Sequence, residues 1–121
     1  MAEALDKIHI RELLLRAIVG INPDERVNKQ DVVISITMHV DLRAACLSDN
    51  MMDTVDYKSV KTRVVALVEN SEFFLIEKMA QAVADICLED ERVKIVDVLV
   101  EKPRALRFAR TVGVEISRTR A

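Results

Sequence analysis

The clearest pattern along the chain is an unbroken alternation of apolar and other residues between Val32 and Leu42. Every second side chain is apolar there, and the side chains between them, such as Thr37 and His39, are mostly polar. A period of two places the apolar side chains on one face of an extended backbone. This segment is therefore predicted to be a half-buried strand.

A second extended segment is predicted before it, from Lys7 to Val19. It opens with an alternation at Ile8 and Ile10 and continues into three consecutive leucines. The two segments can pair as a hairpin, joined by a charged loop from Gly20 to about Asp31 that is longer than a tight turn. Long loops with clustered charge are frequent sites of function.

The apolar period changes to about 3.6 in the middle of the chain, which predicts two helices. Val60, Val64 and Val68 share one face of a first helix that starts after Asp56 and Tyr57. A second helix is expected from about Leu75 to Leu88. Both helices have one apolar side that must be buried.

Two further strands are predicted, because residues 93–102 are rich in β-branched side chains and residues 112–117 alternate. The order ββααββ predicts a single α+β domain over residues 1–121, an antiparallel sheet with two helices on one face. Such a sheet has exposed edge strands. Pairing of these edges between subunits would close an oligomeric barrel.

Composition limits the class of protein further. The 121 residues are 50% hydrophobic, and only two glycines and two prolines are present, so no flexible linker is expected. No leader-like apolar region and no membrane-spanning run occur in the sequence, so a soluble, cytoplasmic protein is expected. Cys46 and Cys87 are expected to be reduced, with Cys87 packed on the apolar face of the second helix.

The charge distribution argues against a general nucleic-acid-binding protein, since the formal net charge is only -2. The final segment is nevertheless basic: from Lys102 onward there are six cations and one acid, Glu115. This segment either meets a multiply charged anion or carries ordinary surface arginines on a solvated strand pair and tail.

Several catalytic machineries lack their motifs in this sequence. His9 and His39 are on separate predicted strands without a metal-ligand spacing, so no metal site is expected. Glycine-rich nucleotide-binding loops and a GxSxG motif are also missing, and no cofactor is predicted. By pattern alone, Glu77 is an acid in the first turn of a helix, Tyr57 a packing residue and Lys102 the end of a strand.

Four segments, found in order along nearly the whole chain, resemble the dihydroneopterin aldolase and dihydroneopterin triphosphate epimerase family. Each segment alone is a weak signal, but together on a ββααββ pattern they identify a resemblance. They are Gly20-Ile21 with Glu25 and Gln30; Val55-Asp56-Tyr57; Phe74-Leu75-Ile76-Glu77-Lys78; and Glu101-Lys102-Pro103 with Val112-Gly113-Val114-Glu115.

The resemblance implies the tunnelling fold, in which tetrameric barrels stack into a homo-octamer with sites between neighbouring subunits. It implies a small pterin substrate and no nucleic acid, membrane or cofactor partner. Glu77 matches the glutamate that binds the 2-amino and N3 hydrogens of the pterin ring, and the same segment places Leu75 and Ile76 at the ring-binding site. Tyr57 belongs to the substrate-binding set as well.

The resemblance also implies chemistry without metal or Schiff base, in which a carbon–carbon bond of the substrate side chain is cleaved or rebuilt. Lys102 matches the catalytic lysine, Tyr57 the catalytic tyrosine and Glu25 a loop glutamate near the reacting side chain. Lys102 could act as a neutral amine, if burial or nearby cations depressed its pKa, or as an ammonium. The sequence leaves both forms open.

Two activities are compatible with these residues. Segments 28–31 and 105–109 are more similar to the epimerase, which inverts C2' of 7,8-dihydroneopterin triphosphate, whereas residues 102–103 and 112–114 are more similar to the aldolase, which releases glycolaldehyde. We expect the epimerase activity, with Arg104 and Arg107 binding the triphosphate of the substrate. A binding subunit without catalysis is a third, different class.

Overall fold

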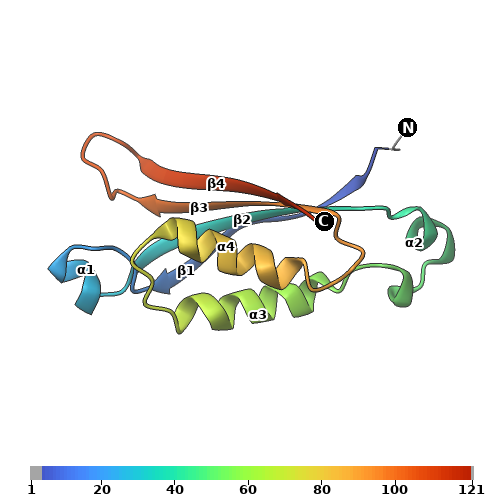
Figure 1. The fold of residues 1–121 in the computed structure, drawn as a ribbon, viewed down its shortest axis with the longest axis horizontal. Helices are drawn as coiled ribbons and strands as arrows, with labels where there is room; N and C mark the ends of the chain where they lie inside the picture. The colour runs from blue at the N-terminus through green and yellow to red at the C-terminus, as the bar shows by residue number, and fades with distance from the viewer. Residues whose placement is uncertain (1–3, 121) are drawn as a thin grey trace.

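The computed structural model describes residues 4–120, and its main elements follow the predicted order ββααββ. Figure 1 shows a single sheet with two long helices beneath it and shorter helical segments at either end. In chain order the elements are β1 (Asp6–Ala17), α1 (Pro23–Val27), β2 (Gln30–Val40), α2 (Arg43–Ser48), the 3-10 turn η1 (Met51–Asp53), α3 (Tyr57–Glu69), α4 (Ile76–Cys87), β3 (Ile95–Pro103) and β4 (Thr111–Thr119).

The four strands form one sheet in the order β1-β2-β3-β4, and every neighbouring pair is antiparallel. Ile36 in the middle of β2 pairs with Ile10 of β1 on one side and with Val98 of β3 on the other. The chain leaves the sheet after β2, forms α3 and α4, and returns as β3. Within one chain, β1 and β4 are therefore the edges of the sheet.

Strand β1 contains a bulge between Ile10 and Leu13, where its pairing with β2 shifts. Glu12 has a φ of 59°, and its backbone N–H donates to Ser35 Oγ at 3.1 Å. The extra residue lets Ile10 before the bulge and Leu13 and Leu15 after it pack against the same core.

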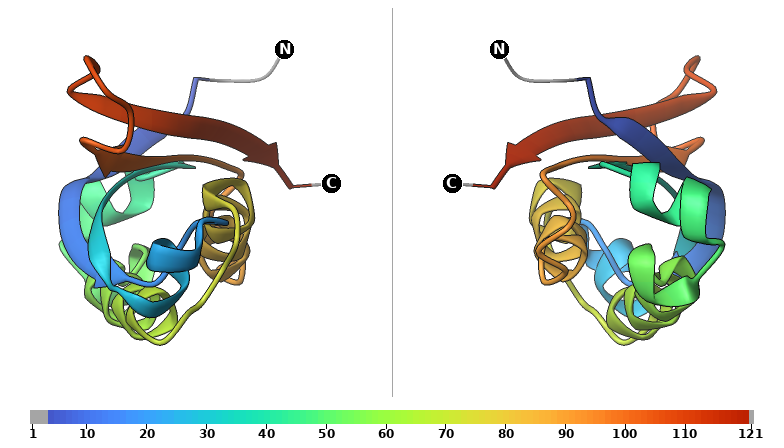
Figure 2. Two further views of the ribbon diagram at one scale, coloured as in Figure 1. Left: turned by 90° about the vertical axis from the view of Figure 1, so that its left-hand side faces the viewer. Right: turned by 90° about the vertical axis from the view of Figure 1, so that its right-hand side faces the viewer.

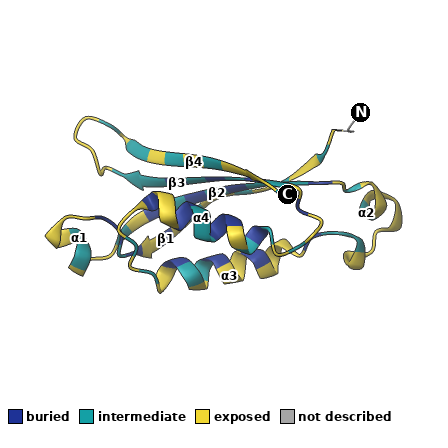
Figure 3. Ribbon diagram, viewed as in Figure 1, coloured by how far each residue is buried: buried dark blue, intermediate teal, exposed yellow. Residues whose placement is uncertain are grey.

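The core lies between the sheet and the two long helices (Figure 2). The alternation predicted for β2 is confirmed, since Ile34, Ile36 and Met38 are at most 1% exposed. Val64 of α3 and Met79 of α4 are fully buried in the same cluster. Figure 3 shows the buried positions of both helices on their sheet-facing sides and the exposed positions on the outside.

The two long helices begin and end close to the predicted residues. The Asp56 side chain accepts a hydrogen bond from the backbone N–H of Ser59 at 3.0 Å and so caps α3. Cys87 is buried in α4, as predicted, and burial raises the pKa of its thiol to about 12. Cys46 is exposed.

The segment between β1 and β2 differs from the prediction, because it contains helix α1 where only a loop was expected. Pro23 occupies the start of this helix, where its fixed φ fits and its missing N–H is no loss. The backbone N–H of Asn22 donates to Glu25 Oε1 at 3.2 Å. Five residues are too few to show a helical period, so the apolar pattern could not reveal this helix.

Helix α2 and the turn η1 were also not predicted. Asp49 ends α2 in the left-handed conformation, with a φ of 57°, and the Asn50 side chain accepts from the backbone N–H of Met52 at 2.9 Å. These local bonds stabilise short segments without an apolar period. Figure 1 places α1 and α2 at opposite ends of the molecule, which we call the α1 end and the α2 end.

Candidate active site

The structure brings Glu25 and Lys102 together, although they are 77 residues apart in sequence. Lys102 Nζ lies 2.7 Å from Glu25 Oε2. Glu25 comes from α1 and Lys102 from the end of β3, so the two elements converge at the α1 end. Both side chains are largely buried, with 16% and 13% of their surfaces exposed. A short ion pair shielded from water is therefore present among the predicted catalytic residues.

Glu25 has further hydrogen-bond partners that stabilise its charged form. Gln30 Nε2 donates to Glu25 Oε2 at 3.1 Å, and the backbone N–H of Asn22 donates to Oε1. The hydrogen bond from Lys102, followed by that from Gln30, lowers the pKa of Glu25 to about 2 against the opposing effect of burial. Glu25 is thus a carboxylate at neutral pH.

Gly20 makes room for this carboxylate. Its φ of 129° is a conformation that other residues rarely adopt, and a Cβ at this position would lie 2.3 Å from the Glu25 carboxyl carbon. The backbone N–H of Gly20 donates to Phe73 O at 3.2 Å, which ties this loop to the segment before α4. Gly20 therefore allows the backbone to approach both Glu25 and the α3–α4 connection.

The ion pair opens into a hollow of about 220 Å³ at the α1 end, which we call the site pocket. Five of the predicted site residues line it together: Glu25, Leu75, Ile76, Glu77 and Lys102. The remaining lining residues are Ile21, Phe74 and Val112. A pocket with apolar walls, two carboxylates and one lysine suits a flat polar ring with hydrogen-bond donors.

Glu77 is the second residue of α4, where the helix dipole favours a negative charge. The side chain is exposed, while Ile76 beside it is 8% exposed and anchors the helix start in the core. Leu75 precedes the helix with an extended backbone, at a φ of -122°, and is half exposed. The segment thus combines a buried anchor with an available carboxylate.

Tyr57 is not part of the site pocket within one chain. It is the first residue of α3, is 52% exposed and borders a hollow with Met51, Asp56 and Lys58. Figure 1 shows that α3 begins at the α2 end whereas α4 begins at the α1 end. The 13 residues of α3 span roughly 20 Å, so Tyr57 and Glu77 of one chain lie far apart.

Arg104 and Arg107 lie in the exposed β3–β4 loop, which projects at the α1 end (Figure 1). Arg104 has a φ of 61°, and its backbone N–H donates to Arg110 O at 3.0 Å. The Arg107 guanidinium lies 5.2 Å from the centre of the Phe108 ring. Neither arginine lines the site pocket, but their loop directly follows Lys102 and Pro103.

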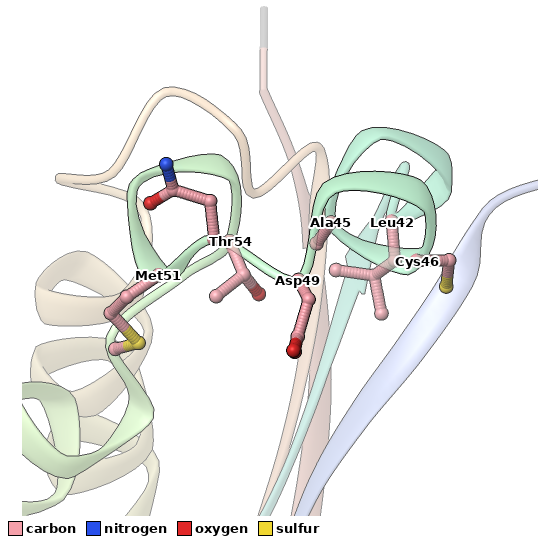
Figure 4. A pocket seen from close by; sticks show the side chains of 7 residues that line it. Leu42, Ala45, Cys46, Asp49, Met51 and Thr54 are labelled. Atoms are coloured by element: carbon pink, nitrogen blue, oxygen red, sulfur yellow. The ribbon is translucent and has the colours of Figure 1, made fainter.

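A larger hollow of about 380 Å³ lies at the α2 end, between α2 and the residues around η1 (Figure 4). Its described lining contains Leu42, Cys46 and Met51, and Asp49 is the one charged residue in it. The site pocket is smaller but combines three charged side chains, and we therefore regard it as the candidate active site.

Two negative findings concern residues 4–120. Within this range, no group of three His, Cys, Asp or Glu side chains is arranged to hold a metal ion. No helix in the same range has both the length and the apolar character needed to span a membrane.

Arg26 and Gln30 contribute to the site but were not predicted as site residues. Gln30 connects Glu25 to the backbone through a second hydrogen bond, from Nε2 to Val19 O at 2.5 Å. Gln30 belongs to one of the four segments that resemble the family, and this membership is the sequence signal that could have identified it. Arg26 bonds the backbone of both loops at the α1 end, and no sequence pattern distinguished it from other loop arginines.

Comparison with known proteins identifies the family of this chain. The family model described as "FolB: Dihydroneopterin aldolase" matches residues 8–117. The chain is 37% identical to the dihydroneopterin triphosphate 2'-epimerase of Escherichia coli, over 97% of this chain and 98% of that protein. It is 42% identical to the folic acid synthesis protein FOL1 of Dictyostelium discoideum, but spans only 18% of that protein.

A solved structure of the related aldolase shares the fold. The crystal structure of Escherichia coli dihydroneopterin aldolase in complex with neopterin superposes with a TM-score of 0.89 at 32% identity, covering 94% of this chain and 99% of that one. The relatives carry both names, aldolase and epimerase, so they agree on the family and differ on the reaction. The chain belongs to the dihydroneopterin aldolase (FolB) family of pterin-processing enzymes, and its α+β sheet with helices on one face is the tunnelling fold of that family.

Proposed function

We propose that this chain is a 7,8-dihydroneopterin triphosphate 2'-epimerase, which inverts C2' to give the 7,8-dihydromonapterin form. The observation that carries the proposal is the site pocket, in which Glu77 and the Glu25–Lys102 pair are brought together. The 37% identity to an epimerase over nearly the full length of both chains supports the finer assignment.

Ring recognition follows from the chemistry of Glu77. The 2-amino group and N3–H of a pterin form a planar edge with two donors, which a carboxylate can accept side by side. Each charge-assisted hydrogen bond contributes on the order of 1.5 to 3 kcal/mol. The helix dipole at the start of α4 supports the ionised carboxylate that this requires. The apolar residues Leu75 and Ile76 would contact the ring plane.

The proposed reaction begins with removal of the proton from the C2' hydroxyl. That oxygen then forms a carbonyl as the C1'–C2' bond breaks, and the bonding electrons move through C6 to N5, which takes up a proton. Re-addition to the opposite face of the C2' aldehyde inverts this carbon and reverses the electron flow. The residues must therefore accept and return protons at two positions.

Glu25 and Lys102 are the proposed proton-handling groups of this chain. Glu25 is ionised and accepts a hydrogen bond from Lys102 Nζ at 2.7 Å. As an ammonium, Lys102 can stabilise the developing alkoxide and donate a proton, whereas the Glu25 carboxylate or a neutral Lys102 amine can accept one. Tyr57 is proposed as a third acid–base group in the completed site.

Tyr57 would reach the pocket only from another subunit, since it lies at the α2 end of its own chain. We propose a homo-octamer of stacked barrels with sites between neighbouring subunits, as the family resemblance implies. The two unpaired edges, β1 and β4, support barrel closure. Exposed apolar side chains at both ends, including Phe74 and Leu75 at one and Met51 and Met52 at the other, support contacts there.

The aldolase is the second candidate, because it needs the same bond cleavage and differs only in releasing the fragment. Glycolaldehyde takes two of the three side-chain carbons and leaves 6-hydroxymethyl-7,8-dihydropterin. The structural similarity to an aldolase with bound neopterin favours this alternative. The choice between the two depends on how well the site retains the cleaved fragment.

Product analysis distinguishes the candidates. The purified protein is incubated separately with 7,8-dihydroneopterin and with its triphosphate, and the products are resolved by chromatography. A C2' diastereomer supports the epimerase, free glycolaldehyde supports the aldolase, and unchanged substrate with measurable binding indicates a binding subunit.

The role of the β3–β4 loop is tested by replacing Arg104 and Arg107 with glutamine together. If the two guanidinium groups meet the triphosphate, KM for the triphosphate rises at least tenfold while KM for unphosphorylated dihydroneopterin changes little. An equal change of KM for both substrates would refute the assignment of these arginines.

A further inference from the structure

Arg26 joins the two loops that form the walls of the site pocket. Its Nη1 donates to Gly20 O and to Phe73 O, both at 3.1 Å, and its Nη2 donates to Glu72 O at 2.8 Å. Gly20 lies 6 residues before Arg26, whereas Glu72 and Phe73 lie 46 and 47 residues after it. One side chain thus fastens the segment before α1 to the segment before α4.

The same guanidinium lies against an aromatic wall of the pocket. Its central carbon is 3.9 Å from the centre of the Phe74 ring, and Phe74 lines the site pocket with 61% of its surface exposed. A cation at this distance is attracted by the face of the ring and restricts its rotation. One face of Phe74 is therefore covered by Arg26, and the remaining surface is available to a ligand.

Arg26, like Arg120, binds backbone carbonyl oxygens, in contrast to the arginines that form ion pairs. Among the described residues it forms no ion pair; its donors are directed at backbone carbonyl oxygens. Arg16, by contrast, is bound to Asp31 at 2.8 Å on the exposed strand surface. A planar guanidinium can serve three carbonyls in fixed directions while stacking on a ring, whereas a lysine ammonium cannot reproduce this arrangement.

We propose that Arg26 is a positioning residue of the pterin site, which holds Phe74 as a flat wall for the bound ring and fixes that wall relative to Glu25. This inference rests on the proposed function, because it assumes that the site pocket binds a pterin. Arg26 does not line the pocket and acts through Phe74 and the two loops. Its loss is expected to affect ring binding more than the chemical step.

The test compares Arg26→Gln and Arg26→Lys in the full chain with Arg16→Gln as a matched control. The dissociation constant for neopterin is measured by titration of its fluorescence, together with KM, kcat and the melting temperature. Both Arg26 variants should raise Kd and KM roughly tenfold with kcat changed less than about threefold, since only binding geometry is lost. Arg16→Gln should leave all three constants unchanged.

A second variant, Phe74→Leu, keeps the three carbonyl hydrogen bonds of Arg26 and removes only the ring. It should raise Kd several-fold, and Arg26→Lys should add little to it in the double variant, because both act on the same wall. If the Arg26 variants do not fold, the Kd of Phe74→Leu for neopterin still tests whether the Phe74 ring contributes to binding.

Three results would overturn the positioning role. One is a lowered melting temperature of the Arg26 variants with an unchanged Kd, which would indicate a purely structural residue. Another is an unchanged Kd for Phe74→Leu. The third is equal binding of neopterin by wild type and all variants, which overturns only the role of Arg26. If the wild-type protein itself binds no neopterin, the proposed function fails together with this role.

Discussion

At the scale of single residues, the proposed roles separate recognition of the ring from proton transfer. Glu77 lies at a helix start, exposed to the pocket, and would identify the ring that both candidate reactions share. Glu25 and Lys102 form a largely buried pair beside it, where charges interact more strongly than in water. Different kinetic constants should therefore respond when the two parts are changed.

Truncation of Glu77 to alanine should raise KM roughly ten- to a hundredfold with a small change in kcat, because about two charge-assisted hydrogen bonds to the ring are lost. Truncation of Lys102 to alanine should instead lower kcat by roughly 10² to 10⁴. Steady-state kinetics on dihydroneopterin and its triphosphate measure both effects. Similar KM defects in the two variants would contradict this division of roles.

The depressed pKa of Glu25 makes a prediction about stability. A carboxylate whose folded pKa is about 2, against an ordinary value of 4.5, contributes stability above pH 4.5 that is lost as the pH falls toward 2. The difference in free energy of unfolding between wild type and Glu25→Gln should therefore shrink over this interval. Denaturant unfolding at a series of pH values tests it, and a constant difference down to pH 2 would argue against the ion pair.

The sequence named five residues that line one pocket, but it did not predict the contacts between them. Glu25 and Lys102 were both named, but only the fold of the loop around α1 brings their atoms to 2.7 Å. No spacing rule links residues 77 positions apart. Arg26 was missed because its partners are backbone carbonyls, which every residue has and no sequence motif marks.

At the scale of elements, the long helices and strands were predictable because each buries a periodic apolar face. The elements that the sequence did not predict are α1, α2 and η1, which are stabilised by local hydrogen bonds and a proline rather than by burial. None of their residues is fully buried. All three short elements contribute residues to a pocket: Glu25 of α1 lines the site pocket, and Cys46 of α2 and Met51 of η1 line the hollow at the α2 end.

Helix α4 connects the core to the site, and a core substitution there should be costly. Met79 is fully buried two residues after Glu77, and Met79→Ala should lower the free energy of unfolding by about 2 to 5 kcal/mol through lost burial and a cavity. Lys78→Ala, on the exposed side of the same turn, should change it by less than about 0.5 kcal/mol. Chemical denaturation measures both variants, and equal losses would contradict the packing.

At the scale of the whole molecule, the sheet has one covered face and one open face. The open face carries polar contacts: His9 Nδ1 lies 3.1 Å from Thr37 Oγ1, and His39 Nε2 lies 2.7 Å from Asp97 Oδ2. Burial raises the pKa of Asp97, but hydrogen bonds from Ser117 and His39 outweigh it, and the net shift is downward. A polar face of this kind suits the water-filled interior of the proposed barrel.

The proposed assembly predicts that two inactive variants can restore each other. Tyr57 lies at the α2 end and Lys102 at the α1 end, so a shared site takes each residue from a different subunit. Lys102→Ala mixed with Tyr57→Phe, by unfolding and refolding together, should regain activity at about a quarter of the sites if subunits combine at random. Turnover of the mixture is compared with each variant refolded alone.

A mixture as inactive as its components would show that Tyr57 and Lys102 do not act across a subunit boundary. Light scattering after size exclusion provides the accompanying control, since refolded wild type and mixture should have the same mass. A monomeric wild type with full activity would contradict the shared site independently of any substitution.

The bulge in β1 has a consequence for changes in chain length. Because residues 11 and 12 lie between two stretches paired with β2, deletion of either Arg11 or Glu12 would leave an even alternation from Ile8 to Ala17. Deletion of a residue within one of the flanking stretches would instead move part of the strand's apolar side chains to the opposite face. A deletion tolerated within this strand during divergence of related sequences should therefore fall at residue 11 or 12.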